Sequence, residues 1–384
     1  MTTQILNEEE RMLQNLVRDF ADRELKPRAR QLDEEEKFSW ENWEGMVRLG
    51  LTGIGIDPKY GGSGGGYRQV AIAAEEVGRG DSSASVTLIA HLSLGTSTIY
   101  RFGNEEQKQR LVPSLASGQG IAAWALTEPG GGSDAAALQT TATRRDGTYF
   151  LNGSKIFITN ADVAESMVVF ATQDRSQGYR GISAFVVQKG APGLQVNPQH
   201  GKMGMRASST NEVVFQDTPV PAEDFLGEEG QGFRYAMEIL DSSRIIIAAQ
   251  CVGIGQAALE EAARYAQQRQ SFGRPIAHHQ AIQFLLADMA TEVHAARVAS
   301  MQAATLKDEG LPFINEASMA KLLASEMCVR VTSQALQVHG GYGYFKDSPV
   351  ERLFRDARVT TIYEGTSEVQ RLVIARQVLA QYQV

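Results

Sequence analysis

The strongest constraint on the fold is a change of hydrophobic period in the middle of the chain. Residues 1–120 and 232–384 carry runs in which apolar side chains recur every three or four positions, the period of an amphipathic helix. Residues 121–231 instead hold short runs of aromatic and β-branched residues separated by Gly, Asn and Asp, which is typical of antiparallel strands. The sequence therefore predicts an α+β fold with an N-terminal helical domain, a middle antiparallel β domain and a C-terminal helical bundle.

The same periods predict individual elements. Residues 70–94, rich in Ala, Ser and Ile, favour one buried helix. Ser367 and Gln370 have the spacing of a capping box, so the last helix is expected to begin near Ser367. The apolar face of the first helix would consist of Ile5, Met12, Leu13, Leu16, Val17 and Phe20. Strands are expected at 149–151, 155–158, 167–171, 182–187 and 212–215, and long C-terminal helices at 233–270, 276–307, 313–339 and 367–382.

Composition excludes several classes of protein. The net charge of −8 argues against binding to nucleic acid or to an anionic membrane by bulk electrostatics. Two cysteines and six histidines without ligand spacing argue against a disulfide scaffold and against a metal site. The longest apolar stretch, 245–254, is too short to span a bilayer. The first residues lack the pattern of a signal or transit peptide, so we expect a bacterial cytoplasmic protein, with a processed mitochondrial matrix protein as the alternative.

One glycine motif resembles a dinucleotide site but lies in the wrong context. Residues 253–258 read Gly-Ile-Gly-Gln-Ala-Ala, which matches G-x-G-x-x-A. That motif binds pyrophosphate only where it follows a strand and opens a helix. Here it falls inside a long helical pattern, so we interpret its small residues as close helix packing.

Five other motifs occur together along the chain. They are ALTEPGGGSD at 125–134, FITN at 157–160, RQSFG at 269–273, QVHGGYG at 337–343 and IYEGTSEVQ at 362–370. In this order and at these spacings, they resemble the acyl-CoA dehydrogenase family of flavoproteins over essentially the whole chain. The resemblance implies FAD bound between the β domain and the C-terminal helices, with part of it contacted by a neighbouring subunit of a homo-oligomer, expected to be a tetramer built as a dimer of dimers.

The resemblance also assigns the cofactor residues. Phe157 stands where the family usually has tryptophan, so stacking on the flavin would be kept while the indole donor is absent. Arg269 and Phe272 would reach the pyrophosphate and adenosine half of a partner's FAD. The full set implied for FAD is Leu126, Thr127, Ser133, Phe157, Thr159, Arg269, Phe272, Gln280, Gln337, Gly341, Thr366 and Glu368.

The resemblance places the catalytic base at Glu364. In the family a carboxylate removes the α hydrogen of an acyl-CoA thioester as a proton, the β hydrogen leaves as hydride to flavin N5, and the product is a trans-2-enoyl-CoA. Electrons then pass to electron-transferring flavoprotein. Some family members carry the base on the long helix instead, at the position of Ser243 here, and serine cannot serve as that base.

The implied substrate residues are less specific. Gln250 would shorten the acyl tunnel at its bottom and Ile246 one turn above, which favours short to medium acyl chains, branched or cyclic ones included. Residues 81–85 lack the arginine that binds the second carboxylate in glutaryl-type members. The residues implied for substrate binding are Ser133, Asp241, Arg244, Gln250, Tyr363 and Gly365.

Two alternatives stay open at the level of sequence. The first is another flavoenzyme of this fold, an acyl-CoA oxidase or a nitroalkane oxidase, although the latter carries aspartate at the base position. The second is a helical binding protein that has kept the fold and lost catalysis.

Overall fold

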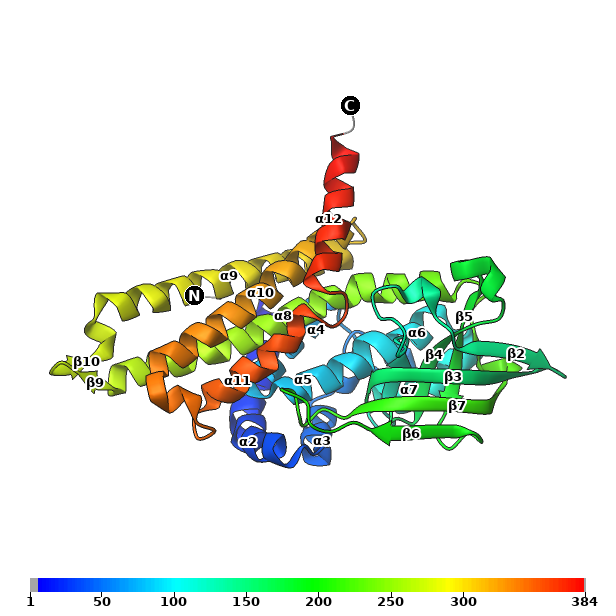
Figure 1. Ribbon diagram of the computed structural model, residues 1–384, viewed down its shortest axis with the longest axis horizontal. Helices are drawn as coiled ribbons and strands as arrows, with labels where there is room; N and C mark the ends of the chain where they lie inside the picture. Colours follow the sequence, from blue (N-terminus) through cyan, green and yellow to red (C-terminus); the bar gives the residue numbers. More distant parts are fainter. Residues whose placement is uncertain (1–5, 383–384) are drawn as a thin grey trace.

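The computed structural model describes residues 6–382 (Figure 1). Helices form one end of the molecule, the β-sheet forms the other, and the last helix, α12, projects from the body. The N-terminal helices are α1 (Glu8–Phe20), α2 (Lys26–Glu35), α3 (Trp40–Arg48), α4 (Tyr67–Gly80), α5 (Ser82–Ile89), α6 (Ser97–Phe102) and α7 (Glu105–Ala116).

The N-terminal helices differ from the expectation in two places. The first helix buries Val17 and Phe20, but Met12 and Leu16 are exposed, and Ile5 lies outside the described residues. Residues 70–94 are not one helix. The chain turns extended at Asp81, whose carboxylate accepts a hydrogen bond from the Ser83 N–H and so caps α5.

The middle of the chain forms an eight-stranded sheet in the order β6-β7-β3-β2-β4-β5-β8, with β1 added beside β4. The five expected strand segments all fall inside its strands. The expectation of a wholly antiparallel sheet was wrong at β1 and β2, which both pair in parallel with β4. The strands are β1 (Ala122–Ala125), β2 (Thr141–Arg145), β3 (Thr148–Thr159), β4 (Ser166–Thr172), β5 (Ile182–Gln188), β6 (Leu194–Pro198), β7 (Thr210–Pro221) and β8 (Phe225–Leu226).

The C-terminal helices are organised around α8. This helix is buried along its centre and packs against α4, α9 and α10. It is long and apolar enough to cross a membrane by those criteria alone, but 78% of its most apolar window is buried inside the protein, as in a core helix. The elements are α8 (Gly232–Gln268), β9 (Gln270–Ser271), β10 (Arg274–Pro275), α9 (Gln280–Asp308), α10 (Ile314–His339), α11 (Pro349–Ala357) and α12 (Ser367–Gln381).

The glycines at 253 and 255 serve this packing. A Cβ on Gly253 would lie 2.0 Å from the backbone oxygen of Glu75 in α4, and one on Gly255 would lie 2.8 Å from the Met327 sulfur in α10. Both glycines are buried in the middle of α8, without a preceding strand. The interpretation of this motif as helix packing is therefore confirmed.

Candidate active site

Glu364 lies in a tight turn between the 3₁₀ turn Arg358–Thr361 and α12. Its backbone φ is +50°, and that of Gly365 is +93°. A glutamate in the left-handed region carries strain, which proteins keep mainly at functional sites. Glycine is favoured at residue 365 because this backbone conformation strains any other residue, and a Cβ there would also lie 2.4 Å from the Gln370 Nε2. The turn places the Glu364 side chain against α8.

The Glu364 carboxylate accepts a hydrogen bond from the Ser243 hydroxyl of α8. Burial raises the pKa of Glu364 above its ordinary value, while the Ser243 hydroxyl and the charges of Lys321 and Arg244 act in the opposite direction. A carboxylate with a raised pKa is a stronger base. The arrangement therefore suits proton abstraction.

Ser243 occupies the position at which a rival base was considered from the sequence. Its hydroxyl contacts the carboxylate of Glu364, so the two candidate base positions, 121 residues apart in the chain, converge on one point. Only one of them carries a carboxylate here. The geometry supports Glu364 as the basic group and gives Ser243 the role of its hydrogen-bond donor.

Arg244 and Asp241 form an ion pair of 2.6 Å between Nη1 and Oδ1 on α8. Arg244 is buried rather than a surface residue, and its Nη1 also lies 3.3 Å from the Ser318 hydroxyl of α10. Its Nε is buried without a hydrogen-bond partner. An unpaired buried guanidinium donor next to Glu364 is a suitable contact for a polar part of a substrate.

Gln250 and Tyr363 form a series of hydrogen bonds beside Glu364. The Tyr363 hydroxyl donates to the Gln250 Oε1 at 2.5 Å, and the Gln250 Nε2 donates to the backbone oxygen of Ser82 at 3.1 Å. Seven residues separate Gln250 from Ser243 on α8, which is about two helical turns or roughly 10 Å. These hydrogen bonds therefore link the turn that carries Tyr363 and Glu364 to α8 and to the α4–α5 junction.

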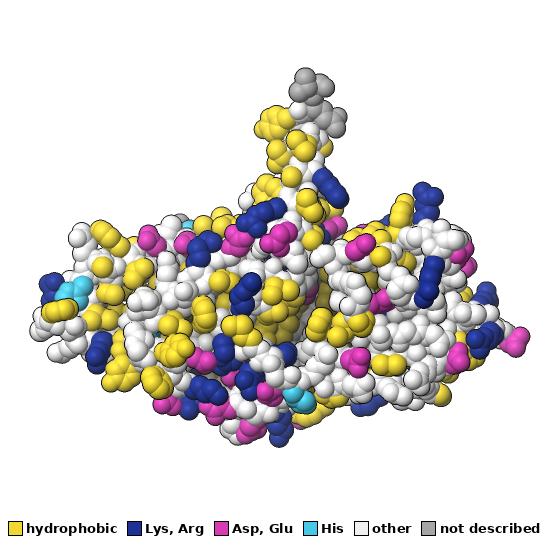
Figure 2. Space-filling model, in the orientation of Figure 1, with side chains coloured by type: hydrophobic (Ala, Val, Ile, Leu, Met, Phe, Trp, Pro, Cys, Tyr) yellow, Lys and Arg dark blue, Asp and Glu magenta, His cyan; other side chains and the backbone are white. Residues whose placement is uncertain are grey.

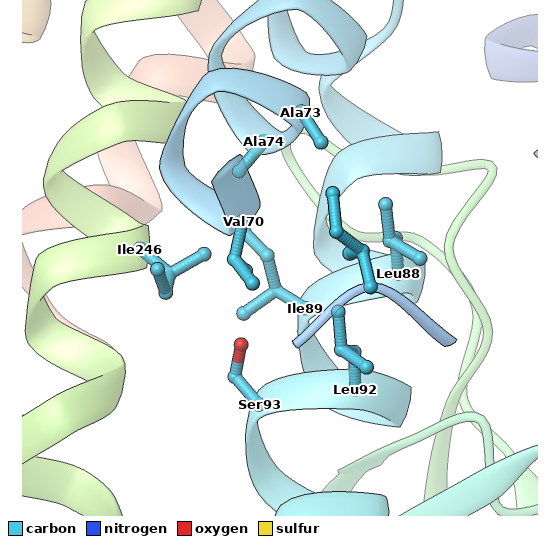
Figure 3. Close-up of a pocket in the computed structure, with 9 residues that line it drawn as sticks. Val70, Ala73, Ala74, Leu88, Ile89, Leu92, Ser93 and Ile246 are labelled. Atoms are coloured by element: carbon cyan, nitrogen blue, oxygen red, sulfur yellow. The ribbon is translucent and has the colours of Figure 1, made fainter. Parts of the chain in front are cut away.

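Ile246 packs in a small apolar void between α4, α5 and α8 (Figure 3). In the close-up its side chain extends toward Val70 and Ile89. The described side chains around this void leave too little room for a water molecule. Ile246 therefore belongs to the core packing, whereas Gln250 contacts Tyr363, the residue before Glu364.

The β-domain residues implied for FAD come from the segment after β1 and from the end of β3, which are joined by a hydrogen bond of 2.9 Å from the Ile156 N–H to the Thr127 oxygen. Leu126 is buried, Thr127 and Thr159 are half-buried, and Ser133 lies in the exposed loop that follows β1. Phe157 has a φ of +61° and is 65% exposed, which is unusual for a large apolar side chain on a strand. An exposed aromatic ring held in a strained backbone is what a planar ligand would cover.

Sequence reasoning missed an ion pair that fixes this loop. The Glu128 carboxylate accepts hydrogen bonds from the Gln139 N–H at 2.5 Å and the Thr140 N–H at 2.9 Å. Lys155 Nζ donates to Glu128 at 2.8 Å and to the Leu126 oxygen at 3.1 Å. One carboxylate thereby joins both ends of the loop. Glu128 lay inside a recognised motif, but its partners are distant in sequence, so no local signal revealed the pair.

Five further residues implied for FAD lie near the far end of α8 (Figure 1). Phe272, in the β9–β10 hairpin, has a φ of +52° and is 94% exposed. The Arg269 guanidinium lies over the Tyr342 ring, 5.4 Å from its centre. Gln280 begins α9, Gln337 lies in the last turn of α10, and Gly341 follows that helix. One chain therefore does not bring this group together with Glu364.

The start of α12 offers polar groups without partners. The expected start of the last helix near Ser367 is confirmed. The expected capping box at Ser367 and Gln370 was wrong: the N-cap is Thr366, whose hydroxyl accepts from the Val369 N–H. The Ser367 Oγ and the Gln370 Oε1 are buried and unpaired. Glu368 is exposed in the first turn. Unpaired polar atoms at a helix N-terminus suit the edge of a polar cofactor.

Comparison with known proteins connects these features. Three family models match the chain: the N-terminal domain of acyl-CoA dehydrogenase over residues 7–119, the middle domain over 123–218, and the C-terminal domain over 230–379. The chain belongs to the acyl-CoA dehydrogenase family. As a member of this family it is an FAD-dependent oxidoreductase. The exposed Phe157 ring and the unpaired Ser367 Oγ and Gln370 Oε1 at the start of α12 fit such a cofactor.

Relatives in the family include short-chain enzymes. The short-chain specific acyl-CoA dehydrogenase of Clostridium acetobutylicum is 46% identical, covering 97% of this chain and 98% of that protein. The structure of butyryl-CoA dehydrogenase from Megasphaera elsdenii has a TM-score of 0.95 and 44% identity, covering 97% of this chain and 99% of that one. A chain in a structure described as the electron transferring flavoprotein of Acidaminococcus fermentans has a TM-score of 0.96 and 44% identity, covering 99% and 100%.

Proposed function

We propose that this acyl-CoA dehydrogenase oxidises short-chain acyl-CoA thioesters to trans-2-enoyl-CoA, with Glu364 as the catalytic base. The single observation that carries the proposal is the Glu364 carboxylate, held by a strained turn against the Ser243 hydroxyl in a site that raises its pKa. FAD, when bound, supplies the acceptor for the β hydrogen as hydride.

The protein's own residues account for the proton. Glu364 takes the α proton of the thioester, and a positioned base of this kind contributes ~10²–10⁴-fold in rate. Ser243 donates to the carboxylate and so limits the directions in which it can turn. Negative charge grows on the thioester oxygen as the proton leaves. The backbone N–H of Glu364 makes no hydrogen bond to another described residue, so it is free to donate to that oxygen.

We assign short acyl chains on the basis of Gln250. Its amide and the Tyr363 hydroxyl would face the end of the acyl chain, and burying apolar carbon against an amide is unfavourable. The similar proteins named short-chain specific and butyryl-CoA dehydrogenase support this assignment. Asp241 and Arg244 would contact the CoA portion, and Ser133 and Gly365 would line the reacting end.

Electron-transferring flavoprotein is the proposed electron acceptor. The similar chain in the Acidaminococcus structure supports this partner.

We further propose a homotetramer, a dimer of dimers, in which the β9–β10 hairpin of one subunit completes the FAD site of another. Two observations support an assembly. Phe272 lies far along α8 from Glu364. Figure 2 shows hydrophobic side chains along the projecting α12, where Leu372, Leu379 and Tyr382 are at least 59% exposed.

Three remaining assignments are coarser. We place the domain boundaries at 120/121 and 231/232. Fatty-acid β-oxidation in the bacterial cytoplasm is the proposed setting, with the mitochondrial matrix as the alternative. None of these three assignments affects the chemistry.

The decisive experiment is anaerobic bleaching of the flavin absorbance by acyl-CoAs of increasing length, linear and branched, for the parent and for Glu364→Gln. We expect bleaching fastest with short chains, and a Glu364→Gln variant that stays yellow, binds ligand and loses most turnover. Parent-like turnover in that variant would refute the assigned base.

The same samples separate the alternatives. Rapid reoxidation of the bleached protein by air would indicate an oxidase. A protein that stays colourless after FAD is added would indicate a binding protein without catalysis.

A further inference from the structure

Lys321 is a buried lysine that none of the sequence motifs contains. It lies in α10, and its side chain is fully buried. Lysine is almost never fully buried without an ionic partner. Among the described residues, however, Lys321 forms no ion pair, and its Nζ donates to the backbone oxygen of Gly365 at 2.8 Å. The buried ammonium of Lys321 therefore binds one carbonyl of the turn formed by Glu364 and Gly365, called the base turn below.

That carbonyl has a second donor from a different helix. The Gln370 Nε2 of α12 donates to the Gly365 oxygen at 3.0 Å, and Gln370 is also fully buried. The Gly365 oxygen is therefore held from α10 on one side and from α12 on the other. Glu364 and Gly365 are consecutive left-handed residues, a conformation that needs such outside restraint because it is strained.

We propose that Lys321 is a positioning residue for Glu364: by holding the Gly365 carbonyl, it fixes the turn that aims the carboxylate, and its charge stabilises that carboxylate in the ionised form. The inference rests on the proposed role of Glu364 as the base.

The charged surroundings of Lys321 fit this role. Burial lowers the pKa of Lys321 to about 8, so the ammonium is the main form at neutral pH. Its positive charge in turn lowers the pKa of Glu364. The titratable and charged groups that act on Lys321 come from three elements: Arg244 and Cys251 of α8, Glu364 of the base turn and Glu368 of α12.

The test compares Lys321→Met with Lys321→Arg. The methionine removes both the donor and the charge, so kcat should fall ~10–100-fold, as for a small misplacement of a catalytic group, while KM changes less than about threefold. The acid limb of the kcat–pH profile should move to higher pH. The arginine keeps the charge but changes the donor geometry, so kcat should fall while the acid limb stays in place.

A purely structural lysine would behave differently. A fall in kcat with an unmoved acid limb in Lys321→Met would overturn the proposal, and so would parent-like kcat in either variant. Lys26→Met is the control for loss of a lysine elsewhere: the Lys26 Nζ of α2 lies 2.6 Å from the Glu261 Oε1 of α8, and its removal should leave the kcat–pH profile unchanged. FAD content and Tm are measured for every variant.

Two further results keep the inference separate from the proposed function. If Glu364→Gln were active, the base assignment would fail, whatever Lys321 does. If Glu364→Gln is inactive and both Lys321 variants match the parent, only the Lys321 inference fails. Should Lys321→Met not fold, Lys321→Arg alone decides: a lower kcat with parent KM supports the role, and an unchanged kcat refutes it.

Discussion

The Glu128–Lys155 pair allows a quantitative prediction for the loop after β1. Replacing Glu128 with leucine removes the only carboxylate that Lys155 contacts among the described residues, and it leaves the Gln139 and Thr140 N–H groups without their acceptor. Breaking a buried pair from one side typically costs about 3–5 kcal/mol. Lys155 is fully buried, so the upper part of this range applies.

The proton on Lys155 sets a ceiling on that loss. Removing the proton from a lysine with the ordinary pKa of 10.5 costs, at pH 7, a free energy of about 3.5 × 1.36 kcal/mol, roughly 5 kcal/mol. Lys155 would lose its proton before the penalty exceeded this value. Burial already lowers its pKa to about 8 with Glu128 present. The unfolded chain then keeps a proton that the folded variant has lost, so raising the pH favours the folded state.

Urea unfolding of the parent, Glu128→Leu, Lys155→Met and the double variant tests this reasoning. At pH 7 we expect Glu128→Leu to lower the free energy of unfolding by about 4–5 kcal/mol, and this loss to become smaller at pH 9. The double variant should recover part of the loss, because no unpaired charge remains. Losses that simply add in the double variant, with no change between the two pH values, would show that the two residues are not coupled.

Three shorter predictions concern the base turn, the acyl site and the α4–α5 junction. Gly365→Ala should destabilise the protein by about 1–3 kcal/mol and reduce kcat, because the backbone there is left-handed and the new Cβ would contact Gln370. Thermal melting and steady-state rates test this. Gln250→Ala should raise kcat/KM for hexanoyl-CoA relative to butyryl-CoA by about tenfold or more, measured on matched substrates. Burial raises the pKa of Asp81 to about 6 from 3.8, so protonated Asp81 stabilises the fold below pH 4 by about 3 kcal/mol, and this contribution is lost as pH rises through 6. Asp81→Asn should remove this dependence of the unfolding free energy on pH, measured by urea unfolding between pH 4 and 7.

Much of the fold could be predicted because it depends on local periodicity. The strand segments and long C-terminal helices follow from the spacing of apolar residues, which each segment carries in itself. The break at Asp81 could not be predicted in this way: residues on both sides are buried, so the hydrophobic pattern continues through it. The parallel pairing of β1 with β4 likewise depends on long-range topology.

The residues of the site likewise fall into those that a local motif reveals and those that depend on distant contacts. Glu364 and Gly365 could be placed from a motif, and the Glu364 side chain does face α8. Lys321 and Lys155 could not be found, because a lysine in a helix or strand pattern reads as a solvated surface residue. Lys321 contacts the Gly365 carbonyl and Lys155 contacts the Glu128 carboxylate, and no spacing in the sequence encodes these contacts.

The length of α8 has a consequence for experiments that mix two inactive variants of the protein. Glu364 contacts Ser243 on this helix, and the 25 positions from Ser243 to Gln268 span about 38 Å, so Phe272 of a chain cannot be brought beside its own Glu364 by any side-chain motion. Under the proposed assembly, chains altered only at Phe272 and chains altered only at Glu364 would each be defective alone. Refolded as a mixture, they would form hybrid pairs in which one of the two sites has both residues intact, and activity would reappear from two inactive parents.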